Sequence, residues 1–118
     1  MYKRQGDDFI KENNISNIDL LKLDLEGAEF DAIQGFSKAL NEKKIRIIQF
    51  EYGYINITTK KLLIDYYNFF SERGYLVGKI FPKYVEFRSY KFKYEDFIGP
   101  NFIAVRENDV ELINQISR

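Results

Sequence analysis

The sequence contains no cysteine and no histidine, and both absences restrict the chemistry that the chain can perform. Without cysteine there is no disulfide framework and no thiolate zinc site, and a cytoplasmic location is the default expectation. Without histidine the chain lacks the commonest general base and the commonest protein ligand of transition metals. Any catalysis must therefore rely on carboxylates, lysine, tyrosine, serine, threonine or a bound cofactor.

An excess of one charge and a long apolar run are also missing. Lysine plus arginine and aspartate plus glutamate each number 18, so no net field favours nucleic acid or an anionic membrane. No apolar run reaches the roughly 18 residues of a membrane-spanning helix, and the N-terminal MYKRQGDDF lacks the apolar segment of a signal peptide. With 118 residues, 45% of them hydrophobic, we expect one globular domain over residues 1–118.

Hydrophobic periodicity predicts an alternation of helices and strands in the first half of the chain. A short helix is expected over residues 7–13, and the mostly apolar residues 18–25 are typical of a strand buried on both faces of a parallel sheet. Helical spacing of apolar side chains predicts an amphipathic helix over residues 28–42. The β-branched and aromatic residues 45–52 predict a second strand.

The second half is expected to continue this alternation. Thr58 or Thr59 is expected to cap a helix that ends before Gly74, where a left-handed residue is favoured. The remaining expected elements are strands over 75–81 and 101–106, a hairpin or an excursion over the sheet at 84–94, and a terminal helix over 109–117. This order of elements indicates an α/β fold with a wound sheet.

Acidic side chains follow the first two predicted strands. Asp24 and Glu26 end the first strand, where Gly27 permits a tight turn, and Glu51 ends the second. In open parallel sheets, ligands bind beyond the carboxyl ends of the strands. If the two strands are adjacent and parallel, these three carboxylates converge where a cofactor or substrate would lie.

Helix capping is the alternative explanation for the acids of this region. Acidic residues in the first turn of a helix stabilise it by roughly 0.3–1 kcal/mol, and this explanation suits Glu29 and Asp31 best. Three carboxylates would also provide oxygen ligands for Mg²⁺ or Ca²⁺. Their spacing gives a metal little support, and no metal ligand is assigned.

The stretch IDLLKLDLEGAEFDAIQGF resembles the hallmark segment of FkbM-type S-adenosylmethionine-dependent methyltransferases. That segment is typically Lys-aliphatic-Asp-aliphatic-Glu-Gly-Ala-Glu, followed by a helix that ends near a glycine. The matching residues here are Lys22, Asp24, Glu26, Gly27, Ala28, Glu29 and Gly35. The segments IIQFEYG (47–53), RGY (73–75) and NFIAV (101–105) are also similar, so the resemblance extends over roughly residues 7–106.

The resemblance implies a partial Rossmann-like class I methyltransferase fold, with a mostly parallel sheet and flanking helices. Family members hold S-adenosylmethionine mainly with a glycine-rich turn after the first strand, whereas the seven glycines here never form G-x-G. By resemblance the chain supplies strands four to seven of the family sheet, without the N-terminal cofactor-binding half. Asp24 and Gly27 are then the nearest candidates for contact with the cofactor, and we expect the isolated chain to be inactive.

The resemblance also implies the reaction. Family members often methylate hydroxyls of sugars or natural products, which implies O-methylation by in-line displacement. The acceptor must lie close to the methyl carbon and lose a proton. The candidate catalytic residues are Asp24, Glu26 and Glu51, since a desolvated carboxylate is a suitable base, and Lys22 is expected to have an orienting or structural role.

Two other functions fit parts of the sequence. The absent glycine loop would suit a non-catalytic half-domain that acts as a binding or assembly module. Residues 79–94 interleave basic and aromatic side chains, as in proteins that bind single-stranded nucleic acid, although a half-buried hairpin has the same alternation.

Absence of the family's first strand would leave residues 18–25 as an open edge. We therefore expect self-association along this strand, or a requirement for the missing half.

Overall fold

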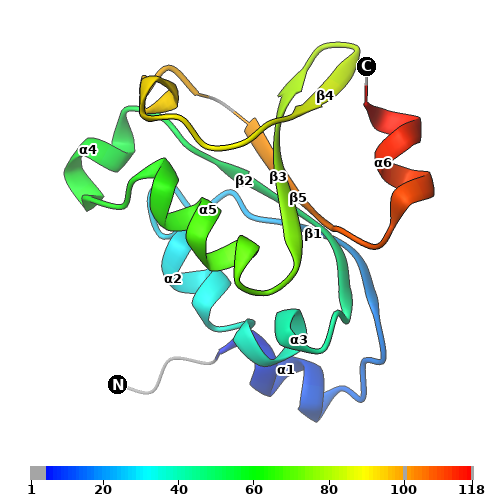
Figure 1. Cartoon of the computed structure of the whole chain (residues 1–118). Coiled ribbons are helices and arrows are strands. Elements are labelled where there is room, and N and C mark those ends of the chain that lie inside the picture. The colour runs from blue at the N-terminus through cyan, green and yellow to red at the C-terminus, as the bar shows by residue number, and fades with distance from the viewer. Residues whose placement is uncertain (1–4, 100, 118) are drawn as a thin grey trace.

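A computed structural model of the chain describes residues 5–99 and 101–117 (Figure 1). Within these ranges, one sheet has the strand order β1-β2-β5-β3-β4. The strands are β1 (Ile18–Lys22), β2 (Ile45–Glu51), β3 (Tyr75–Phe81), β4 (Tyr84–Phe87) and β5 (Asn101–Arg106). The helices are α1 (Gly6–Glu12), α2 (Glu29–Gln34), α3 (Ser37–Asn41), α4 (Ile55–Thr59), α5 (Leu63–Ser71) and α6 (Val110–Ile116), with a 3₁₀ turn at Phe92–Tyr94. None of these helices is long and apolar enough to cross a lipid bilayer.

The fold class is confirmed as α/β, but the expectation of a mostly parallel sheet is wrong. Only β1 and β2 pair in parallel, whereas β2–β5, β5–β3 and β3–β4 are antiparallel. Parallel neighbours need a long crossover connection, which is usually a helix. The chain instead returns from β3 through the β4 hairpin and the 3₁₀ turn, so β5 enters the sheet antiparallel to both of its neighbours.

The strand directions bring the last residues of β1 and β2 to the same end of the sheet as the first residue of β5. Lys22 pairs with Gln49, and Glu51 pairs with Asn101, the first residue of β5. We call this end of the sheet the rim. Segments that are far apart in the sequence therefore meet at the rim.

Helices cover both faces of the sheet. Figure 1 shows α2 and α5 on one side and α6 on the other. On the α5 side, Phe50 stacks on Tyr66 with ring centroids 4.6 Å apart and on Phe102 at 5.9 Å. On the α6 side, Ile103 and Val105 belong to a smaller cluster around Leu112. The alternation of β5 between the two clusters explains why this strand is almost entirely buried.

β1 differs from its prediction, because it is an edge strand rather than one buried on both faces. Among the described residues it pairs only with β2. Asp19 and Lys22 are exposed, and the side chain of Leu20 is 55% exposed. The predicted open edge is thus present, within Ile18–Lys22.

The single helix predicted over residues 28–42 is divided into α2 and α3 by a contact from α1. The backbone N–H of Asp7 donates to the carbonyl of Gly35 at 2.9 Å. The Asp7 carboxylate accepts from the N–H groups of Lys38 and Ala39 at 2.9 and 3.0 Å. These contacts stop α2 and begin α3, because they satisfy backbone groups that one continuous helix would pair internally.

Capping of the next long helix by Thr58 or Thr59 is also wrong, because both lie inside α4. That helix ends at Thr59, the following Lys60 has a left-handed φ of 60°, and α5 begins only at Leu63. Gly74 has φ +78°, as expected after a helix. The remaining elements were predicted within a few residues of their observed bounds. Residues 84–94 differ in part, because only β4 forms a hairpin there, with β3, and a 3₁₀ turn follows.

Candidate functional site

A cavity of about 380 Å³ opens at the rim, and the three predicted carboxylates line it together. Its lining residues are Asp24, Glu26, Glu51, Tyr52, Gly53, Tyr54, Ile55, Ile98 and Gly99. They come from the turn after β1, the end of β2, the start of α4 and the loop before β5. We call this space the rim cavity.

The parallel register of β1 and β2 explains why the acids meet. Lys22 pairs with Gln49, and the N–H of Leu23 donates to the carbonyl of Gln49 at 2.9 Å. Asp24 and Glu51 each lie two residues beyond this pair, Asp24 in the turn after β1 and Glu51 at the end of β2. Lys22 itself is exposed and does not line the rim cavity.

The turn that carries Asp24 and Glu26 is held by a buried acid. Glu29, 1% exposed, accepts hydrogen bonds from the N–H groups of Leu25 at 2.9 Å and Gly27 at 2.8 Å. The helix-dipole explanation of Glu29 is therefore incomplete, because its carboxylate fixes the turn itself. Asp31, two residues further along α2 and therefore on nearly the opposite side of the helix, remains exposed.

The turn also needs two residues with positive φ. Glu26 has φ 46° and Gly27 has φ 101°. A Cβ at Gly27 would lie 2.9 Å from Cγ2 of Thr59, so this glycine lets the turn pack closely on α4. Asp24 lines the rim cavity whereas Gly27 does not, so of the two proposed cofactor contacts only Asp24 faces this space.

The electrostatics of the rim cavity single out Glu51. Burial raises the pKa of Glu51 above its ordinary value of 4.5. Three neighbouring carboxylates raise it further, those of Asp24, Glu29 and Glu26, and Lys22 acts in the opposite direction. A carboxylate with a raised pKa is a better proton acceptor, as general-base catalysis requires.

The opposite wall comes from the loop before β5, which sequence reasoning missed. Gly99, with φ +73°, lies so close to the chain at Tyr52 that a Cβ there would be 2.9 Å from the Tyr52 carbonyl oxygen. Tyr54 and Ile98, 78% and 79% exposed, bring large side chains to the opening. The available signal was Gly99 itself, a glycine that comes just before the last predicted strand.

No group of three or more acidic side chains in residues 5–99 and 101–117 has a geometry suited to a metal ion. The rim cavity combines the three carboxylates with the apolar side chains of Ile55 and Ile98, so its surface is negatively charged and partly apolar. Such a surface complements a cation or a hydroxyl that donates hydrogen bonds.

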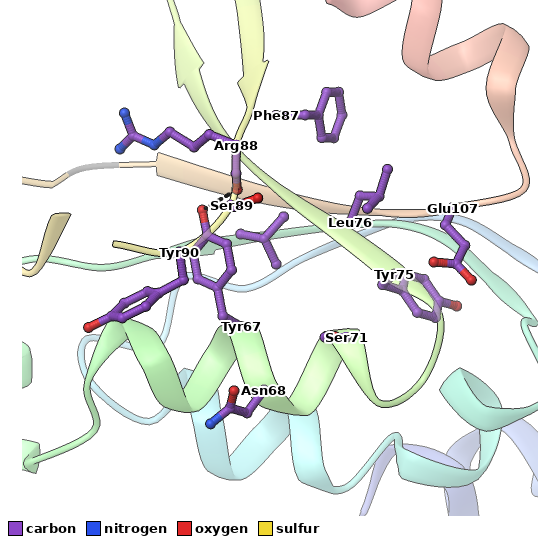
Figure 2. A pocket seen from close by; sticks show the side chains of 11 residues that line it. Tyr67, Asn68, Ser71, Tyr75, Leu76, Phe87, Arg88, Ser89, Tyr90 and Glu107 are labelled. Atoms are coloured by element: carbon purple, nitrogen blue, oxygen red, sulfur yellow. Dashed lines mark hydrogen bonds between the residues drawn. The ribbon is translucent and has the colours of Figure 1, made fainter. Parts of the chain in front are cut away.

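A second cavity, of about 500 Å³, lies between α5 and the β3–β4 region (Figure 2). The hydroxyl of Tyr67 donates to the carbonyl of Arg88 at 3.1 Å across it. The Arg88 guanidinium lies 3.6 Å from the ring centroid of Tyr94, and Lys79 lies 5.7 Å from that of Phe81. Lys79 and Arg88 thus lie over aromatic rings of the same segment. Binding of single-stranded nucleic acid by this segment stays a prediction.

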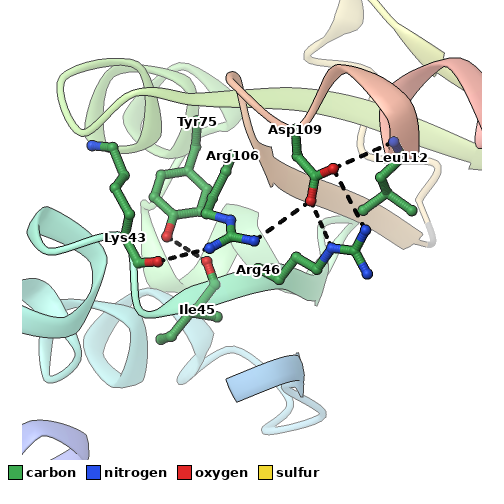
Figure 3. Close-up of polar contacts among 7 residues, drawn as sticks. All are labelled: Lys43, Ile45, Arg46, Tyr75, Arg106, Asp109 and Leu112. Carbon is green, nitrogen blue, oxygen red and sulfur yellow. Dashed lines mark hydrogen bonds and ion pairs between the residues drawn. The ribbon is translucent and has the colours of Figure 1, made fainter. Parts of the chain in front are cut away.

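A cluster of charges at the end of the sheet opposite the rim attaches α6 (Figure 3). Asp109 accepts from Nε of Arg46 at 2.6 Å and lies 3.5 Å from Nη2 of Arg106. The hydrogen bond from Arg46 lowers the pKa of Asp109. Arg106 also donates to the carbonyl of Lys43 at 3.0 Å. The groups of this cluster bond one another, which explains it as a structural element.

Comparison with known proteins gives one family match. The family model of the methyltransferase FkbM domain matches residues 4–77, which include the KLDLEGAE segment and all three rim carboxylates. No curated protein and no solved structure matches. The matched range covers more than half of the chain, and the chain therefore belongs to the methyltransferase FkbM domain family.

Proposed function

We propose that the rim cavity takes part in S-adenosylmethionine-dependent O-methylation of a sugar or natural-product hydroxyl. One observation carries the proposal: in a chain of a methyltransferase family, Asp24, Glu26 and Glu51 line a single cavity at the rim of the sheet. The negative charge of the cavity suits a cationic sulfonium donor. Asp24 is the residue of this chain that we assign to contact with the donor.

The proposed mechanism gives the carboxylates separate roles. When bound, S-adenosylmethionine supplies an activated methyl group. Glu51, whose pKa is raised, would accept the proton that the acceptor hydroxyl loses when its oxygen takes the methyl group and the sulfur–methyl bond breaks. Glu26 accepts a hydrogen bond from a second hydroxyl of the acceptor and so orients it. The exposed ring of Tyr54 offers an apolar surface beside these groups.

Calorimetric titration of the 118-residue chain with S-adenosylmethionine and with its demethylated product tests the proposal directly. The sequence alone predicts an inactive isolated chain, because the glycine-rich turn is absent. Since the rim carboxylates nevertheless share one cavity, we expect one site per chain, with weaker binding in Asp24→Asn. A second measurement follows transfer of a labelled methyl group to a panel of glycosides and phenols. No heat of binding at millimolar ligand, together with no transfer to any acceptor, would refute the proposal for this chain.

A non-catalytic binding or assembly module is the second candidate, and the open edge of β1 favours it. Beside this edge, α1, β1 and α2 enclose a groove of about 680 Å³. Its apolar lining includes Phe9, Leu21, Leu23, Leu25 and Phe36. Under this alternative the chain binds a partner at β1 and transfers no methyl group.

A further inference from the structure

Polar contacts behind the rim cavity converge on Glu95. Its Oε1 accepts from the hydroxyl of Tyr52 at 2.5 Å and from the N–H of Leu63 at 2.8 Å. Its Oε2 accepts from the hydroxyl of Tyr90 at 2.6 Å and from the N–H of Ile64 at 3.0 Å. An ionised carboxylate offers about four acceptor positions, so these donors use its full capacity.

These four donors come from three separate parts of the fold. Leu63 and Ile64 begin α5, Tyr90 lies between β4 and the 3₁₀ turn, and Tyr52 directly follows β2. Glu95 itself begins the segment that runs to β5. One side chain therefore fixes the position of the loop before β5 relative to both the end of β2 and the start of α5.

Tyr52 connects this carboxylate with the rim cavity. Its side chain is 1% exposed, it lines the cavity, and it is the next residue after Glu51. Its ring centroid lies 5.5 Å from that of Phe97, and its carbonyl is in close contact with Gly99. The two walls of the cavity therefore meet at Tyr52, the residue that Glu95 holds.

We infer that Glu95 is a positioning residue of the site, which through Tyr52 sets the place of Glu51 on one wall and of Gly99 on the other. The consequence for catalysis rests on the proposed function. The positional part concerns only residues of this chain, so it can be tested without a ligand.

The protonation states of Glu95 and of its two tyrosine donors suit a positioning role. Burial by itself would raise the pKa of Glu95, but hydrogen bonds from Tyr52, Tyr90 and the α5 amides outweigh it and hold this pKa below its ordinary value of 4.5. Burial and the contact with Glu95 raise the pKa of Tyr52, and raise that of Tyr90 to about 12. At neutral pH an anionic carboxylate thus faces two neutral phenol donors.

Tyr52→Phe and Tyr90→Phe form a matched pair of variants. Each removes one phenol donor to the same carboxylate without changing the net charge, but only Tyr52 lines the rim cavity. The first readout is the pH titration of the Glu51 carboxyl carbon by NMR. We expect Tyr52→Phe to move the pKa of Glu51 down toward its ordinary value, and Tyr90→Phe to leave it unchanged.

The second readout is methyl transfer. A small displacement of a base lowers turnover strongly, so we expect kcat to fall about tenfold in Tyr52→Phe and to stay within about twofold in Tyr90→Phe. Chemical denaturation of both variants shows whether they lose similar stability. If Tyr52→Phe does not fold, Glu95→Asp replaces it, because this change keeps the charge and withdraws the carboxylate by one methylene.

The two readouts separate the inference from the proposed function. If the unaltered chain transfers no methyl group, the proposed function fails while the NMR titration still decides the role of Glu95. An unchanged Glu51 titration in Tyr52→Phe overturns the inference. So does an equal change in both variants, since it would mean that Glu95 only stabilises the fold.

Discussion

The carboxylate of Glu29 accepts a 2.8 Å hydrogen bond from the backbone N–H of Gly27, two residues before it. A second bond, from the N–H of Leu25, completes the attachment of the turn that carries Asp24 and Glu26. A buried acid thus fixes the backbone on which two exposed acids stand. Because Glu29 bonds the backbone of the turn, Asp24 and Glu26 are not needed to hold it, and their carboxylates are available to a ligand.

Replacing this buried acid tests its structural role. Glu29→Gln leaves one backbone N–H without an acceptor, so we expect a loss of roughly 1–3 kcal/mol in the free energy of unfolding. The control is Asp31→Asn on the same helix, where exposure limits the change to about 0.5 kcal/mol. Urea denaturation followed by circular dichroism measures both, and equal stabilities would contradict the assigned role.

Asp24→Asn tests the catalytic assignment. The side chain is exposed, so the fold and its thermal midpoint should be retained. Loss of the charge that contacts the sulfonium donor, an interaction of roughly 1.5–3 kcal/mol, should lower kcat/KM for methyl transfer about 10- to 100-fold. Asp19→Asn, the same change at the other end of the same strand region, is the control and should retain activity. Near-normal transfer in Asp24→Asn removes this residue from the mechanism.

Glu51→Gln should stabilise the fold while it abolishes transfer. The folded-state pKa of Glu51 lies above its ordinary value of 4.5, so ionisation penalises the folded chain as pH rises through this interval. This penalty persists at neutral pH. It is absent in acid, where Glu51 is protonated in both the folded and the unfolded chain. We therefore expect a higher thermal midpoint at pH 7 and none of this gain below about pH 4. The control is Glu72→Gln, at an exposed position outside the rim cavity, where we expect no such gain in the thermal midpoint. A lower midpoint for Glu51→Gln at pH 7 would contradict the assignment.

Glu95 should contribute stability with the opposite pH dependence. Its folded-state pKa lies below 4.5, so the ionised form favours the folded chain at higher pH. This contribution is lost as the pH falls through the folded-state value. Glu95→Gln should therefore unfold at a lower temperature than the original chain at pH 6, and the difference between the two thermal midpoints should shrink toward pH 2. The charges of two nearby acids also raise the pKa of these tyrosines, Asp96 that of Tyr52 and Asp65 that of Tyr90, so the comparison must use the difference between the two chains.

The open edge of β1 should cause self-association. Its outer N–H and C=O groups have no strand partner in the described part of the chain, Leu20 is exposed, and the formal net charge of +0 provides no repulsion between copies. We expect light scattering to detect dimers at high micromolar concentration. Leu20→Lys should shift the population to monomers, whereas Leu76→Lys, on β3, should not. A monomeric original chain at these concentrations contradicts the expectation.

Local patterns were sufficient to predict most elements and the convergence of the acids. Residues 45–52 are rich in β-branched and aromatic side chains, and both this segment and residues 75–81 are strands within a residue of their predicted bounds. The meeting of Asp24 and Glu51 required only that two successive strands be parallel neighbours, which is the commonest outcome when a helical segment connects them.

Features that depend on distant contacts were not predictable from the sequence. The break between α2 and α3 depends on Asp7, whose carboxylate bonds Lys38 31 residues away. The anchoring role of Glu95 depends on Tyr52, 43 residues away, and no local pattern marks either residue. The direction of β5 likewise follows from the course of the preceding hairpin.

The antiparallel direction of β5 has a consequence for how related chains can differ in the acceptor that they select. Since β5 runs against its neighbours, its beginning rather than its end faces the acids, and the wall at Ile98 and Gly99 belongs to a connecting segment. Insertions or exchanges there would reshape the mouth of the pocket while leaving every strand register intact. If the rim cavity binds the acceptor as proposed, acceptor selectivity and sheet architecture are encoded in separate stretches of this polypeptide.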